Sequence, residues 1–147
     1  PDGRCRVYNR EEMAFGYRTS IVKTKPCVVL STVLKLKKGD RSEISATMQE
    51  LSAKRREKQP LEYPSAGSTF KRPEGYFAGK LIMDAGLAGA CVGGAQVSEK
   101  HCGFVINRKN ATSADVAGLI QKVTETVQEK FGVTLEPEVI FLGDFEK

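Results

Sequence analysis

Short segments with β-strand character are spread along the whole chain. Residues 4–8 alternate polar and apolar side chains, and residues 27–36 begin as an apolar run and end in alternation. Both patterns are typical of strands. Residues 90–92, 104–107 and 134–142 are also rich in residues that favour strands. The pattern therefore predicts a sheet of short strands.

Two longer segments have the spacing of amphipathic helices. Within residues 41–58, Ile44, Met48 and Leu51 recur at i, i+4 and i+7, after Asp40 or Ser42 as a possible N-cap. This spacing predicts a helix with a thin apolar stripe.

The second long helix is predicted from Thr112 or Ser113, either of which is a suitable N-cap, to residue 131. Its apolar face consists of Val116, Leu119, Ile120, Val123, Val127 and Phe131. Gly132 is predicted to end it. Residues 76–85 form a predicted short helix that stops at Gly86. The whole pattern predicts an α+β fold in which two long helices and one short helix pack on a small mixed sheet.

Length and charge narrow the class of protein. The 147 residues suit one modest core. No apolar run is long enough to span a bilayer and no signal peptide opens the chain, so we expect no membrane partner. Because residue 1 is proline and a predicted strand follows at once, we expect the chain to begin inside a longer protein. The net charge of +5 favours anionic partners without choosing among them.

The cysteine pattern does not predict a metal site. Cys5, Cys27, Cys91 and Cys102 form no Cys-x-x-Cys pair, and the single histidine, His101, is adjacent to Cys102. Adjacent residues lack the spacing of zinc ligands. We expect four free, mostly buried thiols in a reducing cytosol.

The run from Pro64 to Pro73 combines a hydroxyl, a glycine and two cations. Ser68 follows Gly67 and precedes Lys71 and Arg72. Gly67 lets the backbone turn or approach a ligand, and Pro73 stiffens the end of the run. One interpretation is an anion-facing loop that presents Ser68. The alternative is a solvated turn of small residues.

Four segments in this order resemble one enzyme family. They are Phe-Gly-Tyr-Arg-Thr-Ser at 15–20, Ser-Ala-Gly-Ser-Thr-Phe-Lys-Arg-Pro at 65–73, the segment 93–101, and Leu-Glu-Pro-Glu-Val at 135–139. Together they resemble the C-terminal half of UDP-N-acetylenolpyruvoylglucosamine reductases. The chain resembles the compact subclass, since the stretch from position 18 to position 68 leaves no room for an extra tyrosine-bearing loop.

The resemblance implies a division of the chain into three parts. Residues 1–38 are the end of the FAD-binding region, residues 39–60 are a connecting helix, and residues 61–147 are the substrate-binding domain. The N-terminal flavin domain, which holds most of the FAD, is missing from this chain. The chain alone is therefore expected to bind no FAD and to have no turnover.

The resemblance also implies an activity. In the family, NADPH reduces FAD, and the flavin passes a hydride to UDP-N-acetylglucosamine enolpyruvate to give UDP-N-acetylmuramate. The implied setting is peptidoglycan synthesis in the bacterial cytoplasm, and through it cell shape and division.

Three residues match the family's catalytic positions. Arg18 would hold the substrate carboxylate and contact the cofactor, because a guanidinium binds a carboxylate in bidentate fashion. Ser68 would donate the proton, aided by nearby cations. Glu138 would be the third catalytic residue; Glu136, two positions away, is the competing carboxylate on the same face.

Three further residues are substrate-binding candidates by the same resemblance, namely Lys58, Lys71 and His101. Arg72 stands where other members have asparagine, which replaces an amide that donates and accepts with a group that only donates.

The basic charge also leaves a second hypothesis, a nucleic-acid-binding module that would use residues 54–58, Lys71, Arg72, Arg108 and Lys109. Aromatic residues are only 7%, and no aromatic-rich basic strand is present. We therefore expect no nucleic-acid partner.

Overall fold

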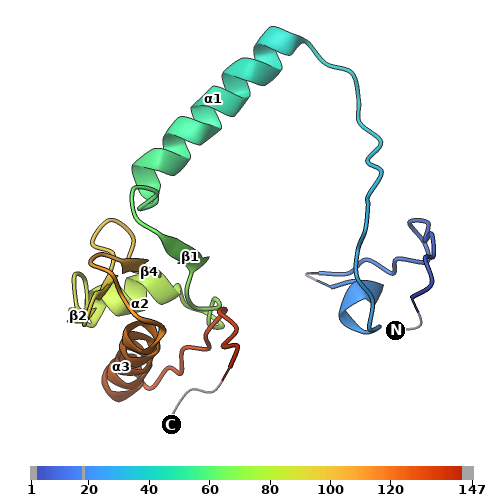
Figure 1. The fold of residues 1–147 in the computed structure, drawn as a ribbon. Coiled ribbons are helices and arrows are strands. Elements are labelled where there is room, and N and C mark those ends of the chain that lie inside the picture. The colour runs from blue at the N-terminus through green and yellow to red at the C-terminus, as the bar shows by residue number, and fades with distance from the viewer. Residues whose placement is uncertain (1–2, 18, 144–147) are drawn as a thin grey trace. The chain divides into compact units, whose positions relative to one another are not determined.

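The computed structural model describes residues 3–17 and 19–143 and divides the chain into two units, Pro1–Asp40 and Arg41–Lys147. The described part of the first unit holds one regular element, the 3-10 helix η1 (Ile21–Lys23) (Figure 1). Its other described residues form turns, a single bridge between Gly16 and Thr19, and irregular backbone.

The predictions of strands at residues 4–8 and 27–36 are wrong, because both segments have irregular backbone. A strand needs a neighbour to satisfy its N–H and C=O groups. The described chain offers no neighbouring strand there, and Val28, Leu30 and Val33 stay largely exposed. Strand-forming residues alone do not make a strand.

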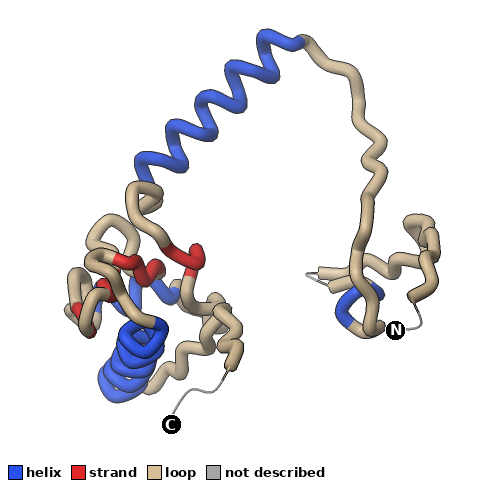
Figure 2. Tube along the Cα trace, viewed as in Figure 1, coloured by secondary structure: helices blue, strands red, loops and turns tan. Residues whose placement is uncertain are grey.

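The second unit contains all the remaining elements (Figures 1 and 2). They are α1 (Arg41–Lys58), β1 (Ser65–Ser68), α2 (Ala78–Asp84), β2 (Cys91–Val92), β3 (Ala95–Val97), β4 (Phe104–Asn107) and α3 (Ser113–Phe131). The four strands form one sheet in the order β1-β4-β3-β2.

The α+β class is confirmed, but every described strand pair is antiparallel rather than mixed. The connections explain the difference. β2 and β3 are joined by Gly93 and Gly94 alone, and a short loop joins β3 to β4. Parallel neighbours need a longer crossover, so these loops join antiparallel strands.

The two long helices occupy the predicted residues. α1 spans 41–58 but buries none of its side chains. α3 begins with a capping box, in which Thr112 Oγ1 accepts the N–H of Asp115 at 3.1 Å and the Asp115 carboxylate accepts the N–H of Thr112 at 2.9 Å. Gly132, at φ +67°, ends α3 in the left-handed region. The predicted short helix is α2, trimmed at both ends.

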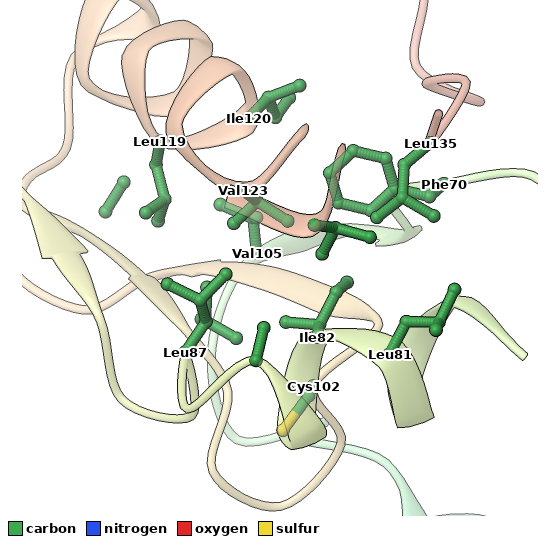
Figure 3. Close-up of a cluster of buried hydrophobic side chains, with 14 residues drawn as sticks. Phe70, Leu81, Ile82, Leu87, Cys102, Val105, Leu119, Ile120, Val123 and Leu135 are labelled. Atoms are coloured by element: carbon green, nitrogen blue, oxygen red, sulfur yellow. The ribbon is translucent and has the colours of Figure 1, made fainter. Parts of the chain in front are cut away.

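The core lies between α3, α2 and one face of the sheet (Figure 3). α3 contributes Leu119, Ile120, Val123 and Val127, α2 contributes Leu81 and Ile82, and the sheet contributes Ala95, Val97 and Val105. Phe70 and Leu135 close the cluster at one end. The spacing of the apolar residues in α3 therefore predicts most of the buried face, but Phe131, which was predicted on that face, is exposed.

The predicted strand at residues 134–142 is reduced to a single bridge, Phe70↔Pro137. Lys71 N–H donates to Glu136 O and Glu138 N–H donates to Thr69 O, both at 2.8 Å. Pro137 has no N–H to continue a ladder, which limits the pairing to this short stretch.

In the described part of the chain, no helix has the length and apolarity needed to cross a membrane. The four cysteines are free, as predicted, but the expectation that most are buried is wrong. Cys5, Cys27 and Cys91 are exposed and Cys102 is buried.

Candidate active site

A cleft of about 390 Å³ opens in the second unit next to Ser68. Its walls come from the end of β1 and the residues after it, from the start of α2, and from the loop before β4. They are lined by Ser68, Phe70, Arg72, Phe77, Ala78, Gly79, Lys80, Met83 and residues 99–103. The structure thus brings two predicted site residues, Ser68 and His101, into one cleft.

The strand geometry explains which residues of the 65–73 run reach this cleft. Ser68, Phe70 and Arg72 line it, whereas Thr69 and Lys71 do not. Side chains alternate between faces along extended backbone, so every second residue is presented to the same side. The run is therefore an extended segment that presents Ser68, and not the exposed turn that its small residues suggest.

The His101 side chain is held in one orientation. Its Nδ1 accepts the N–H of Gly103 at 3.1 Å, and its ring meets that of Phe104 edge-on, with centroids 4.9 Å apart. The ring also lies against Gly79, where an added Cβ would come within 3.4 Å of Cε1. Because Nδ1 accepts, the neutral ring carries its proton on Nε2. His101 therefore suits the role of a hydrogen-bond donor.

Positive charge predominates in the cleft. Arg72, Lys80 and Lys100 line it together with the carboxylate of Glu99, and Lys80 Nζ is also paired with the Asp84 carboxylate at 2.8 Å. The Arg72 guanidinium lies 4.1 Å from the centre of the Phe77 ring, a cation–π contact. Clefts lined by one sign of charge attract ligands of the other sign, so this cleft suits an anion.

Lys100 also shapes the electrostatics beside the cleft. Its Nζ lies 3.4 Å from the Glu62 carboxylate. A hydrogen bond from the backbone of Glu62, followed by the charges of Lys100 and Arg108, lowers the pKa of the Glu62 carboxyl. This pair is exposed, and Lys100 also lines the cleft.

Cys102 belongs both to the cleft wall and to the hydrophobic core. Burial raises the pKa of its thiol, since a thiolate is poorly solvated there. The neutral thiol packs in the hydrophobic core (Figure 3). The reactive polar groups of the cleft are therefore the Ser68 hydroxyl, the His101 ring and the cations.

Glu138 directly follows the bridge residue Pro137 and does not line the cleft. Its backbone N–H donates to Thr69 O at 2.8 Å, so it is paired one residue away from Ser68. Its side chain is exposed. The competing carboxylate, Glu136, forms an ion pair with Lys71.

The other predicted residues lie away from the cleft. Lys71 engages Glu136, and Lys58 is the exposed last residue of α1; neither lines the cleft. Arg18 lies outside the described residues. Lys80, Lys100 and Phe77 line the cleft but are not sequence-predicted site residues. The sequence did contain a signal for Lys100 as a site residue, because Lys100 directly precedes His101.

No group of histidine, cysteine and carboxylate side chains within residues 3–17 and 19–143 is arranged to hold a metal ion.

The fold and the cleft define a class of protein, an α+β domain with a cleft that holds a serine, an oriented imidazole and several cations. The chain belongs to the UDP-N-acetylenolpyruvoylglucosamine reductase family, and its residues 59–142 match the C-terminal domain of that family.

Its relatives bear that name. The reductase of Agathobacter rectalis is 61% identical over 144 residues, which are 98% of this chain and 46% of that protein. The reductase of Lachnoclostridium phytofermentans is 59% identical, over 97% of this chain and 46% of that protein. The crystal structure of the Thermus caldophilus enzyme is similar with a TM-score of 0.68 and 36% identity, over 94% of this chain and 49% of that one. The chain therefore spans about half the length of these relatives.

Proposed function

We propose that this chain is the substrate-binding and proton-donating half of a flavin-dependent reductase. The reaction is the NADPH-dependent conversion of UDP-N-acetylglucosamine enolpyruvate to UDP-N-acetylmuramate, in the peptidoglycan synthesis of a bacterial cytoplasm. Residues 1–38 would complete the flavin domain and residues 61–147 would bind substrate. Residues 39–60 would form the helix that connects these two parts. The observation that carries the proposal is the shared cleft of Ser68 and His101, in a chain that matches the family's C-terminal domain.

Ser68 is the proton donor in this proposal. Hydride addition to the terminal carbon of the enolpyruvyl group leaves negative charge on the neighbouring carbon and the carboxylate. The Ser68 hydroxyl gives its proton to that carbon, and the oxygen becomes an alkoxide. A serine is a poor acid in water, so the alkoxide needs positive charge nearby. Arg72 and Lys100, which line the same cleft, supply it.

The other polar residues of the cleft are proposed to bind the anionic and sugar parts of the substrate. A diphosphate carries charge that Lys100 and Arg72 attract, and the Nε2–H of a neutral His101 suits a phosphate or sugar oxygen. Lys58 and Lys71 are proposed as further contacts, Lys71 after release from its exposed pair with Glu136.

Two other catalytic roles rest on the family motifs. Arg18 would hold the substrate carboxylate and contact the flavin. Glu138, whose backbone N–H donates to Thr69 O next to Ser68, would act beside the substrate carboxylate.

The N-terminus of α3 is not open to the diphosphate of FAD. A dinucleotide diphosphate commonly sits at a helix N-terminus. At α3 the Asp115 carboxylate already accepts the N–H groups of Thr112 and Gly94, at 2.9 and 3.2 Å. A bound flavin would supply the hydride; its binding is assigned to the flavin domain that precedes this half in the proposal. The relatives are reductases and give no support to a nucleic-acid-binding module.

The test is Ser68→Ala in a complete reductase with this chain as its C-terminal half. We expect NADPH to reduce the flavin at the parent rate, while reoxidation by substrate slows by at least about 100-fold, the usual scale for a lost general acid. Stopped-flow absorbance separates the two steps. Ser113→Ala, at the start of α3, is the matched control and should change neither. An equal effect of Ser68→Ala on both steps would contradict the proton-donor role.

A further inference from the structure

We propose that Gly67 is a positioning residue, whose β-bulge turns the Ser68 side chain onto the face of the sheet that leads to the cleft. This role of Gly67 rests on the proposed role of Ser68, because the bulge orients the Ser68 side chain.

The bulge is visible in the register of β1 against β4. Ser65 lies opposite Ile106, and Ser68 lies opposite Phe104. Three steps along β1 thus match two steps along β4, so β1 carries one extra residue. Gly67, just before Ser68, has φ +86°. A glycine in that region is characteristic of a bulge, and bulges often re-aim side chains next to active sites.

The extra residue decides the face on which Ser68 lies. Residues opposite each other on antiparallel strands share a face, so Ser68 shares the face of Phe104, whose ring contacts His101. Without the extra residue, Gly67 would lie opposite Phe104. Ser68 would then move to the other face, that of Val105, which packs in the hydrophobic core. A one-residue slip exchanges the two faces of a strand.

The residue after Ser68 holds the backbone in the bulged register. Thr69 N–H donates to Gly103 O at 2.8 Å, and Thr69 Oγ1 accepts the N–H of Val105 at 3.0 Å. Thr69 O accepts the N–H of Glu138 at 2.8 Å. Its side chain is buried, so these bonds are protected from water. The bulge is therefore followed by a residue that is bonded both to the start of β4 and to the segment around Pro137.

The space around Gly67 makes a clean test possible. A Cβ added at Gly67 would meet no heavy atom within 4 Å. Gly67→Ala therefore acts through the backbone conformation, which L-residues with a Cβ rarely adopt. Gly132, at φ +67° with the same open surroundings, caps α3 away from the cleft and provides a matched control.

The experiment compares the two half-reactions in a complete reductase with this chain as its C-terminal half. We expect Gly67→Ala to slow flavin reoxidation by substrate about tenfold or more, which corresponds to the cost of a left-handed alanine, and to leave reduction by NADPH unchanged. Gly132→Ala should lower the melting temperature to a similar extent without slowing reoxidation. Gly67→Asn should recover most of the rate, because asparagine tolerates positive φ.

The outcomes separate this inference from the proposed function. Ser68→Ala is the reference variant. If it leaves flavin reoxidation unchanged, the proposed proton-donor role of Ser68 is itself contradicted. If Ser68→Ala slows reoxidation but Gly67→Ala does not, the positioning role of Gly67 is overturned. Equal slowing by Gly132→Ala would also overturn it, since general strain would explain the loss. Should Gly67→Ala fail to fold, Gly67→Asn decides: a normal rate supports the inference, and a rate as low as that of Ser68→Ala overturns it.

Discussion

The turn between β2 and β3 gives the sharpest prediction about stability. A Cβ added at Gly94 would lie 2.2 Å from Lys109 O and 2.6 Å from the backbone N of Ala111. These are backbone atoms, which cannot swing aside as a side chain does. Gly94→Ala must therefore push the turn and the 107–111 loop apart.

The cost can be worked from the bonds at that junction. Gly94 O accepts the N–H groups of Arg108 and Lys109 at 3.0 and 3.1 Å, and Gly94 N–H donates to Asp115. Losing bonds to the loop at about 1 kcal/mol each, together with overpacking of about 1–3 kcal/mol, lowers the free energy of unfolding by about 3 kcal/mol. For a unit of this size that is a fall in Tm of about 12 °C or more.

The assay is thermal and urea unfolding followed by circular dichroism. Gly118→Ala is the matched control, because it is the same chemical change within α3 and its Cβ would meet only Val92 Cγ1 at 3.5 Å. Replacing glycine inside a helix should raise the free energy of unfolding by up to about 1 kcal/mol. The reasoning is refuted if Gly94→Ala melts within 3 °C (less than about 1 kcal/mol) of the parent, or if both variants lose equal stability.

Three further predictions concern the charged and thiol groups. Backbone hydrogen bonds from Thr112 and Gly94 lower the pKa of the Asp115 carboxyl. The contribution of this carboxylate to the free energy of unfolding is therefore fully present above its pKa in the unfolded chain, and it is lost as the pH falls through its pKa in the folded chain. Asp115→Ala should therefore be less stable than the parent at neutral pH, with the gap closing in acid; a gap independent of pH in unfolding curves would contradict this. Lys71→Ala should change the free energy of unfolding by less than about 1 kcal/mol, since its pair with Glu136 is exposed, and a larger loss by urea titration would show a buried role. Burial and the raised pKa of Cys102 should make it the last of the four cysteines to react with iodoacetamide, and equal labelling by mass spectrometry would count against the core packing.

Local pattern predicted the helices well. The 3.6-residue spacing and the capping residues of α3 are properties of neighbouring positions, and they located the helix and its buried face. The 41–58 helix was predicted with the same bounds as α1. The α+β class followed from these elements.

The strands show the limit of local reasoning. Residues 27–36 have strong strand composition but irregular backbone, whereas β1 is built from Ser65, Ala66, Gly67 and Ser68, of which the serines and the glycine favour turns. Pairing with β4 makes β1 a strand, and that partner lies far along the sequence. Strand formation depends on such partners more than on composition.

The same limit applies to the site. Motif resemblance singled out Ser68 and His101, and the fold places both in one cleft. It could not identify Phe77 or Lys80, because their contribution depends on where α2 packs. It also could not foresee that Lys71 would pair with Glu136 while Lys100 lines the cleft.

The most direct test of the central claim is an NMR titration of the chain with UDP-N-acetylglucosamine enolpyruvate, which asks whether the cleft beside Ser68 binds the substrate. We predict saturable shifts of the backbone amides of residues 68–72 and 99–103, which form two walls of the cleft, while amides of residues 41–50 in the first half of α1 stay unchanged. Unshifted cleft amides at substrate concentrations that saturate the complete reductase would contradict the account, as would shifts confined to residues 41–50.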